Sequence, residues 1–370
     1  MELSDDVGLK VDLQSRGLRL SLEDDHGRLG GAGPAEGITL FLGGLVATVP
    51  TAAAFVATSP YSLHQRGGGT VLERDGRELC QVEVASRPAW YSRATAGGVP
   101  LEKIALRHGR DCIGSTVAQA CARQEPCLFC GIFLSRDAGA TVARKTPGDI
   151  AEVAAAALVE GFTHAVLTTG TTDPRDCGIP LLVSCSKAVK HATDGRMEVH
   201  VQYEPPRDFT LIDEAAGFAD SAAINIECFD RDTLARVAPG KASLGLERYR
   251  SAWERAVEAM GEGRVACFII AGLGEPEESV LEGCRMLTSL GVFPYVLPLR
   301  PIPGTPMGSA APPPASRMLS IYEAASEIIS ASGLSPSESQ RAGCVRCGAC
   351  SAITDVLGWG VDRPLSRLPR

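Results

Sequence analysis

The chain has 370 residues and an ordinary apolar content of 45%, enough for one large domain with additions. A net charge of −8 and the lack of any block of lysine and arginine argue against nucleic acid as a partner. Thirteen cysteines, in a chain whose first residues are acidic and form no secretory signal peptide, predict reduced thiols in a cytoplasmic protein.

An uncharged run at residues 38–58 is long enough to cross a bilayer. Gly43 and Gly44 break the run, Pro50 lies in its middle, and several threonines dilute it. We therefore interpret it as a buried strand, a turn and a second apolar segment, and we expect no membrane as a partner.

Residues 71–84 form a predicted β-hairpin, in which Asp75 and Gly76 favour a type I′ turn. The first part of the chain lacks the helix–strand alternation that follows later. We expect a small β-rich N-terminal domain over residues 1–95.

Strands alternate with helices from about residue 105 onward. One helix is predicted to begin at Pro147, because Thr146 can cap it and Asp149 favours its positive end. Alternating strands and helices imply a parallel sheet, so the fold class predicted for residues 96–335 is an α/β, TIM-like partial or full barrel. The predicted strands cover residues 112–118, 164–168, 198–204, 222–227, 265–272 and 293–299.

Cys121, Cys127 and Cys130 form a C-x5-C-x2-C run directly after the first of these strands. Thiolates so close together can ligate a soft metal centre, and an iron–sulfur cluster is the natural candidate. Three thiols leave one iron of a [4Fe–4S] cube open to bind a small molecule. A zinc site is one alternative, although structural zinc requires a fourth ligand, and a chance cluster of core cysteines is another.

This run resembles the cluster loop of radical S-adenosylmethionine (SAM) enzymes, in which an aromatic residue, here Phe129, precedes the last cysteine. Their commonest spacing is C-x3-C-x2-C. The longer spacing is similar to that of a minority of the superfamily near biotin synthase. The resemblance implies a [4Fe–4S] cluster on the three cysteines and SAM as the second cofactor.

Further residues resemble the SAM-binding positions of that branch, and each lies at or near the C-terminal end of a predicted strand. They are Gly170 with Thr171 and Arg300, which follow strands, and Glu204, Asn225 with Glu227, and Ile270 with Gly272, which lie on the last residues of strands. Arg250 takes the place of an arginine that holds the SAM carboxylate. Individually, Asn225 and Glu227 could instead cap a strand end, and Arg250 could lie on a solvated helix face.

A narrower likeness joins the chain to radical SAM proteins whose genes accompany a nitrilase cluster. The residues that carry it are the blocks at 102–109, 239–241 and 300–306. This likeness does not indicate the reaction.

Residues 336–370 form a predicted Cys-rich tail, in which Cys344, Cys347 and Cys350 resemble a ferredoxin ligand run. The spacing suggests a second iron–sulfur cluster, with zinc or an unmetallated redox tail as alternatives. The fourth ligand could be an earlier cysteine, water or substrate. We expect the tail to cover either the mouth of the barrel or its bottom.

The function predicted from these features is that of a radical SAM enzyme. Such an enzyme cleaves SAM reductively to a 5′-deoxyadenosyl radical, which takes a hydrogen atom from a small-molecule substrate. An electron donor such as flavodoxin or ferredoxin is implied. The alternatives are a SAM cleavage that transfers the aminocarboxypropyl group, and a non-catalytic iron–sulfur carrier or scaffold.

Overall fold

The computed structural model describes residues 5–20, 37–336 and 340–358, which build two β-sheets and the helices around them. The first sheet has the strand order β1-β4-β5-β6-β2-β3, and helix α1 (Asp5–Arg16) precedes it. Its strands are β1 (Arg19–Leu20), β2 (Gly37–Leu42), β3 (Leu45–Pro50), β4 (Tyr61–Arg66), β5 (Gly69–Arg74) and β6 (Arg77–Val84). Short 3-10 helices lie at Ala54–Thr58, Ala89–Ser92 and Leu101–Lys103.

The second sheet is an open half barrel with the strand order β13-β12-β11-β10-β9-β8-β7. All neighbours pair in parallel except β7 and β8, which are antiparallel. The strands are β7 (Leu106–His108), β8 (Cys112–Ala118), β9 (His164–Thr169), β10 (Glu198–Tyr203), β11 (Ser221–Ile224), β12 (Val265–Ala271) and β13 (Phe293–Pro298). The predicted α/β partial barrel is confirmed, and the antiparallel strand β7 is an addition that the sequence did not indicate.

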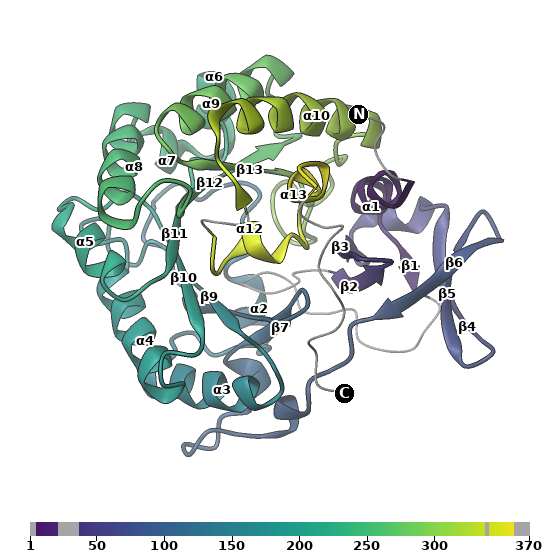
Figure 1. The fold of residues 1–370 in the computed structure, drawn as a ribbon, viewed down its shortest axis with the longest axis horizontal. Helices are drawn as coiled ribbons and strands as arrows, with labels where there is room; N and C mark the ends of the chain where they lie inside the picture. The colour runs from purple at the N-terminus through teal and green to yellow at the C-terminus, as the bar shows by residue number, and fades with distance from the viewer. Residues whose placement is uncertain (1–4, 21–36, 337–339, 359–370) are drawn as a thin grey trace.

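Helices cover the outside of the half barrel (Figure 1). They are α3 (Pro147–Val159), α4 (Ile179–Ala192), α5 (Thr210–Ala216), α6 (Arg231–Val237), α7 (Pro239–Ala242), α8 (Leu246–Met260), α9 (Glu277–Ser289) and α10 (Ala315–Ser332). A short helix α2 (Leu134–Asp137) follows the cysteine loop, and α12 (Cys344–Cys347) and α13 (Ile353–Val356) belong to the tail.

Two local predictions are confirmed in atomic detail. Thr146 and Asp149 form a reciprocal capping box at the start of α3, where Pro147 occupies the first turn. Asp75 and Gly76 both have positive φ, at 51° and 76°, as a type I′ turn between β5 and β6 requires. Residues 38–50 form the β2–β3 hairpin, and no helix in the described part of the chain is long and apolar enough to cross a membrane.

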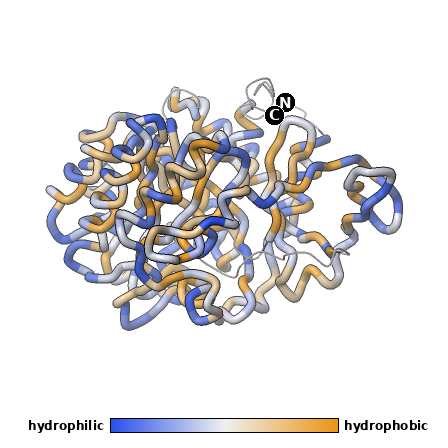
Figure 2. The backbone as a smooth tube through the Cα atoms, turned by 90° about the horizontal axis from the view of Figure 1, so that it is seen from below, coloured by the Kyte–Doolittle hydropathy of each residue, from blue (hydrophilic) through white to orange (hydrophobic). Residues whose placement is uncertain are grey.

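Side chains of the half barrel alternate between its lumen and its helical cover, as strand geometry dictates. On β8 and β9 the residues facing the lumen are Gly114, Thr116, Val166 and Thr168. Leu167, between the last two, is fully buried in the hydrophobic core. Hydrophobic stretches run through the molecule's interior, whereas the outermost turns are hydrophilic (Figure 2).

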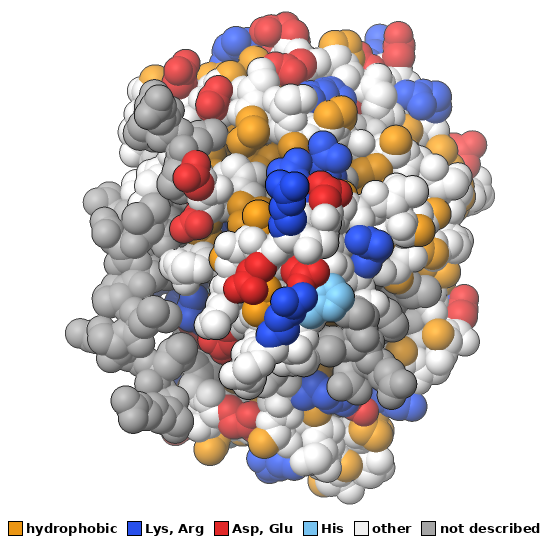
Figure 3. Space-filling view, turned by 90° about the vertical axis from the view of Figure 1, so that its right-hand side faces the viewer, with side chains coloured by type: hydrophobic (Ala, Val, Ile, Leu, Met, Phe, Trp, Pro, Cys, Tyr) orange, Lys and Arg blue, Asp and Glu red, His pale blue; other side chains and the backbone are white. Residues whose placement is uncertain are grey.

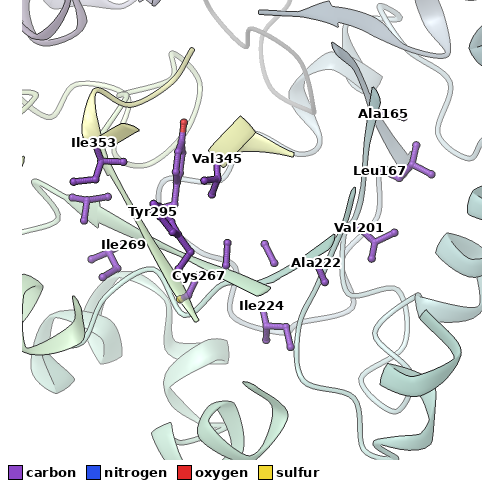
Figure 4. Close-up of a cluster of buried hydrophobic side chains, with 14 of the residues drawn as sticks. Ala165, Leu167, Val201, Ala222, Ile224, Cys267, Ile269, Tyr295, Val345 and Ile353 are labelled. Atoms are coloured by element: carbon purple, nitrogen blue, oxygen red, sulfur yellow. The ribbon is translucent and has the colours of Figure 1, made fainter. Parts of the chain in front are cut away.

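Residues 340–358 of the C-terminal tail lie inside the curve of the half barrel (Figure 1). Val345 and Ile353 lie on either side of Tyr295 of β13, and all three side chains are buried (Figure 4). The tail also reaches the N-terminal ends of the strands: Arg346 donates to Asp111 just before β8, and Ser221 at the start of β11 donates to the carbonyl of Ala342. The bottom of the barrel is therefore closed by the tail.

The first sheet is joined to the barrel through this same tail. The amide of Thr48 on edge strand β3 donates to the carbonyl of Ala349 at 2.7 Å, and Ser351 donates to the carbonyl of Val296 on edge strand β13. Because one short segment hydrogen-bonds to edge strands of both sheets, the domain boundaries at residues 95 and 335 remain predictions. Acidic and basic side chains are interspersed on the side of the molecule that carries the first sheet (Figure 3).

A buried ion pair reinforces this junction, and it yields a stability prediction. Lys10 on α1 is fully buried, donates to the carbonyl of Gly348 at 2.8 Å, and pairs with Asp355 on α13 at 2.5 Å. Lys10→Ala leaves the buried carboxylate without its cation, so we expect a loss of about 3–5 kcal/mol in the free energy of unfolding. Urea unfolding measures it.

Arg16→Ala is the matched control, because Arg16 forms an exposed pair with Asp12 on the same helix. Such surface pairs contribute about 1 kcal/mol or less. Equal destabilisation by the two variants would contradict the assignment of Lys10 as the residue that joins α1 to the tail.

Candidate active site

The loop of Cys121, Cys127 and Cys130, called the mouth site below, lies at the C-terminal end of β8. Main-chain hydrogen bonds fix it to the neighbouring loops: Ala122 donates to the carbonyl of Thr171 at 2.7 Å, and Leu128 donates to that of Val237 at 2.8 Å. In a parallel barrel this end of the strands carries the chemistry. The sequence predicted the mouth site at this end.

Gly170 allows the close approach of this loop to the end of β9. A Cβ atom at residue 170 would lie 2.0 Å from the carbonyl oxygen of Ala120, which no side chain tolerates. Thr171, next to it, is buried. The predicted pair Gly170 and Thr171 therefore supports the cysteine loop through its backbone in this structure.

The three thiols of the mouth site lie close enough to interact through their charges: Cys130 interacts with both Cys127 and Cys121. Burial raises the pKa of the Cys127 thiol to about 12. Within residues 5–20, 37–336 and 340–358, no three His, Cys, Asp or Glu side chains converge as the ligands of a single metal ion would. An iron–sulfur cube binds each thiolate through a separate iron, so its cysteines have no such common point.

Two ion pairs stand beside the mouth site, and both involve predicted residues. Glu204 accepts from Arg123 of the cysteine loop at 2.5 Å, and Glu227 accepts from Lys241 at 3.0 Å. All four side chains are at most 14% exposed. Asn225, also predicted, accepts from the amide of Phe268 through its side-chain oxygen at 3.0 Å and receives the Lys241 amine on its carbonyl.

Lys241 and Arg123 were not among the predicted site residues. Burial opposes the charged form of Lys241, but Glu227 and the other negative groups around it outweigh burial and raise its pKa. Lys241 belonged to the block at 239–241 that carries the likeness to nitrilase-cluster proteins. The sequence therefore singled out this lysine but did not indicate what it binds. A buried cation needs a carboxylate partner, and that partner is visible only in the fold.

Tyr249 on α8 adds a polar atom that the described residues leave unpaired. Its ring is fully buried and its hydroxyl has no hydrogen-bond partner in this part of the chain. Lys241, Glu204 and Glu227 are the charged groups around that hydroxyl. A buried hydroxyl normally has a partner, and a polar group of a cofactor bound among these charged residues could supply one.

The structure does not bring Arg250 to this site, which corrects its predicted contact with the SAM carboxylate. The Arg250 side chain is half exposed and pairs with Glu254 one turn later on the surface of α8. Arg250 therefore lies on a solvated helix face, which was the alternative considered for it. Arg123 and Lys241 are the cations beside the mouth site instead.

The turn after β12 is held by Glu275, which is buried and accepts from the amide of Gly272 at 2.9 Å and from Arg317 at 2.7 Å. Gly272 has a φ of 107°, a conformation that favours glycine. The amide of Ile270 donates to the carbonyl of Glu227 at 2.8 Å. The predicted residues Ile270 and Gly272 therefore have structural roles in this fold: Ile270 holds the backbone of Glu227, and Gly272 forms the turn.

Phe129 and Cys130 cap a cavity of about 350 Å³ in the barrel lumen, a size suited to a small molecule. Its wall is mainly apolar, with Phe268, Tyr295 and Leu297 on it. No aspartate, glutamate, lysine or arginine is among its lining residues in the described chain.

Cys344, Cys347 and Cys350 of the tail, called the floor site below, lie at the opposite end of this cavity, which Cys344 and Cys350 line. Burial opposes ionisation of Cys350, but His108 and Arg300 lower the pKa of its thiol to about 6. Arg300, predicted as a cofactor contact, donates to the carbonyl of Thr48 at 3.0 Å and lies near the floor site.

Comparisons with known proteins can now be set beside the half barrel and its mouth site. No family model matches the chain. A bacteriochlorophyllide c C-7(1)-hydroxylase of Chlorobaculum limnaeum is 26% identical over 349 residues, which cover 88% of this chain and 84% of the relative.

Two solved structures are similar to the chain at 16% identity. Methylornithine synthase covers 70% of this chain and 73% of its own with a TM-score of 0.48. A radical SAM methyltransferase from Sphaerobacter thermophilus covers 74% and 75% with a TM-score of 0.44. The second of these matches is named a radical SAM enzyme, the class that the sequence resembles. The narrower likeness to nitrilase-cluster proteins stays a prediction.

Proposed function

We propose that the chain is a radical SAM enzyme whose mouth site holds the [4Fe–4S] cluster on Cys121, Cys127 and Cys130. The observation that carries the proposal is the group at the barrel mouth. Three thiols lie beside two largely buried cation–carboxylate pairs and a hydroxyl without a partner among the described residues, above an apolar cavity. A cluster held by these cysteines would supply the electron for reductive cleavage of SAM to methionine and a 5′-deoxyadenosyl radical.

The charged residues of the mouth suit the polar groups of SAM. Glu204 and Glu227 can accept hydrogen bonds from its amino and ribose hydroxyl groups, while Arg123 and Lys241 favour its carboxylate. Each of these side chains already has a partner, so its position is fixed before SAM binds. Preorganised groups of this kind lose little conformational entropy on binding.

The lumen suits a small substrate without a full charge, because no aspartate, glutamate, lysine or arginine of the described residues lines it. The apolar wall keeps water from the reacting centre. The curated relative is named a hydroxylase, and hydroxylation begins at a C–H bond. We therefore favour hydrogen abstraction from carbon over transfer of the aminocarboxypropyl group.

We further propose that the floor site holds a second iron–sulfur cluster. What supports it is the placement of three largely buried thiols on one short segment, with two of them on the wall of the cavity. An electron donor such as flavodoxin or ferredoxin and a cytoplasmic location complete the proposal.

The first test is anaerobic reconstitution followed by product analysis with SAM and dithionite. We expect an electron paramagnetic resonance signal that changes when SAM is added, and 5′-deoxyadenosine among the products. Formation of an aminocarboxypropyl product instead would assign the other cleavage. An unchanged signal at normal iron loading would rule out SAM at the mouth site.

Neighbouring residues of α8 provide the second test. Tyr249→Phe removes a hydroxyl that has no partner in the described chain, so we expect unchanged stability but SAM binding weaker by about 2- to 12-fold, the usual range for one neutral hydrogen bond. Arg250→Ala is the control, because its side chain lies on the outer surface. Equilibrium dialysis with labelled SAM measures both. Weaker binding by Arg250→Ala alone would reverse this assignment.

The third test concerns the floor site. Substituting alanine for Cys344, Cys347 and Cys350 should remove about half of the iron, since two clusters of equal iron content are proposed, and leave the SAM-responsive signal. Iron analysis and paramagnetic resonance on the same sample check this. Full iron retention, or zinc in anaerobically purified protein, would refute the second cluster.

A further inference from the structure

His108 lies on β7, the edge strand opposite β13 in the half-barrel sheet, and contacts the floor site. It is buried, and its Nε2 atom lies 3.5 Å from the Sγ atom of Cys350. The sulfur of Cys347 lies 4.0 Å from the His108 carbonyl oxygen. Both contacts join residues more than 230 positions apart in the chain.

The neighbour of His108 is a glycine for a reason that involves the same site. A Cβ atom on Gly109 would lie 2.4 Å from the sulfur of Cys347, and Gly109 has a φ of 61°. No other residue type permits this approach without displacing the thiol. The end of β7 is therefore shaped to receive the floor site.

Gln202 on β10 supplies a second contact. Its side-chain amide nitrogen lies 3.7 Å from the sulfur of Cys344, within the range of an N–H···S hydrogen bond. Gln202 also lines the cavity, as do His108, Cys344 and Cys350. Two of the three floor thiols thus have a nitrogen donor from the barrel itself.

The proton of His108 can be assigned from its surroundings. Its other ring nitrogen, Nδ1, is buried and has no hydrogen-bond partner among the described residues. A proton on Nδ1 would be an unsatisfied donor, whereas a proton on Nε2 points to the sulfur of Cys350. We therefore assign His108 as a donor to Cys350 through Nε2.

We propose that His108 and Gln202 are positioning residues of the floor site, whose hydrogen bonds to Cys350 and Cys344 raise the reduction potential of the cluster held there. The inference rests on the proposed second cluster. Reduction adds negative charge to a cluster and its thiolates, and hydrogen bonds to the sulfurs stabilise that charge. The mouth site differs, because carboxylates of Glu204 and Glu227 lie near Cys127.

The test uses the full chain with Cys121, Cys127 and Cys130 replaced by alanine, so that only the floor site is loaded. In that background we compare His108→Phe and Gln202→Leu with the parent by redox titration monitored by paramagnetic resonance. We expect each variant to lower the midpoint potential. A tenfold shift in the reduction equilibrium corresponds to about 59 mV for a one-electron couple.

Two further variants make the result specific. His108→Gln retains an amide donor and should recover part of the potential. His64→Phe, on the first sheet and beside Glu73, should leave it unchanged. Normal iron content with an unchanged potential in His108→Phe and Gln202→Leu would overturn this inference alone. A parent chain without any cluster would overturn the second cluster itself, and this inference with it.

Discussion

The open half barrel is the constraint on which the rest of the structure depends. A seven-stranded sheet that does not close leaves unpaired main-chain groups along β7 and β13. The tail supplies a hydrogen bond at the β13 edge, where Ser351 donates to the carbonyl of Val296. The same segment hydrogen-bonds to edge strand β3 through the carbonyl of Ala349. One short segment therefore stabilises two sheets. Because the tail is fixed to the barrel, it also fixes the position of the first sheet.

This arrangement also creates the cavity. Because the tail enters the bottom and side of the half barrel, Cys344 and Cys350 face the same space that Cys130 faces from the mouth. The two ends differ in charge. Glu204 and Glu227 stand at the mouth, whereas the neighbours of the floor thiols include the nitrogen donors of Gln202 and His108 and the cation of Arg300. A substrate in the lumen would contact both ends.

Much of the fold could be predicted from local rules. The limits of β8 were predicted without error, and the capping box of Thr146 and the turn at Asp75 follow from short-range chemistry. The error at Arg250 was avoidable. The apolar stripe of α8 includes Tyr249, and the next residue on a helix points about 100° away from it, toward solvent. Lys241 and His108 could not be predicted, since their partners are distant in sequence.

The conformation of Glu227 shows how the barrel supports the mouth site. Its φ of 76° is rare for a residue with a side chain, and such a conformation costs about 1–3 kcal/mol. The backbone of Glu227 is held on both sides, because its amide donates to Phe268 and its carbonyl accepts from Ile270. These bonds continue the pairing with β12 beyond the end of β11. The strained peptide thus directs a carboxylate at Lys241 beside the cysteine loop, where a regular strand residue would alternate away from it.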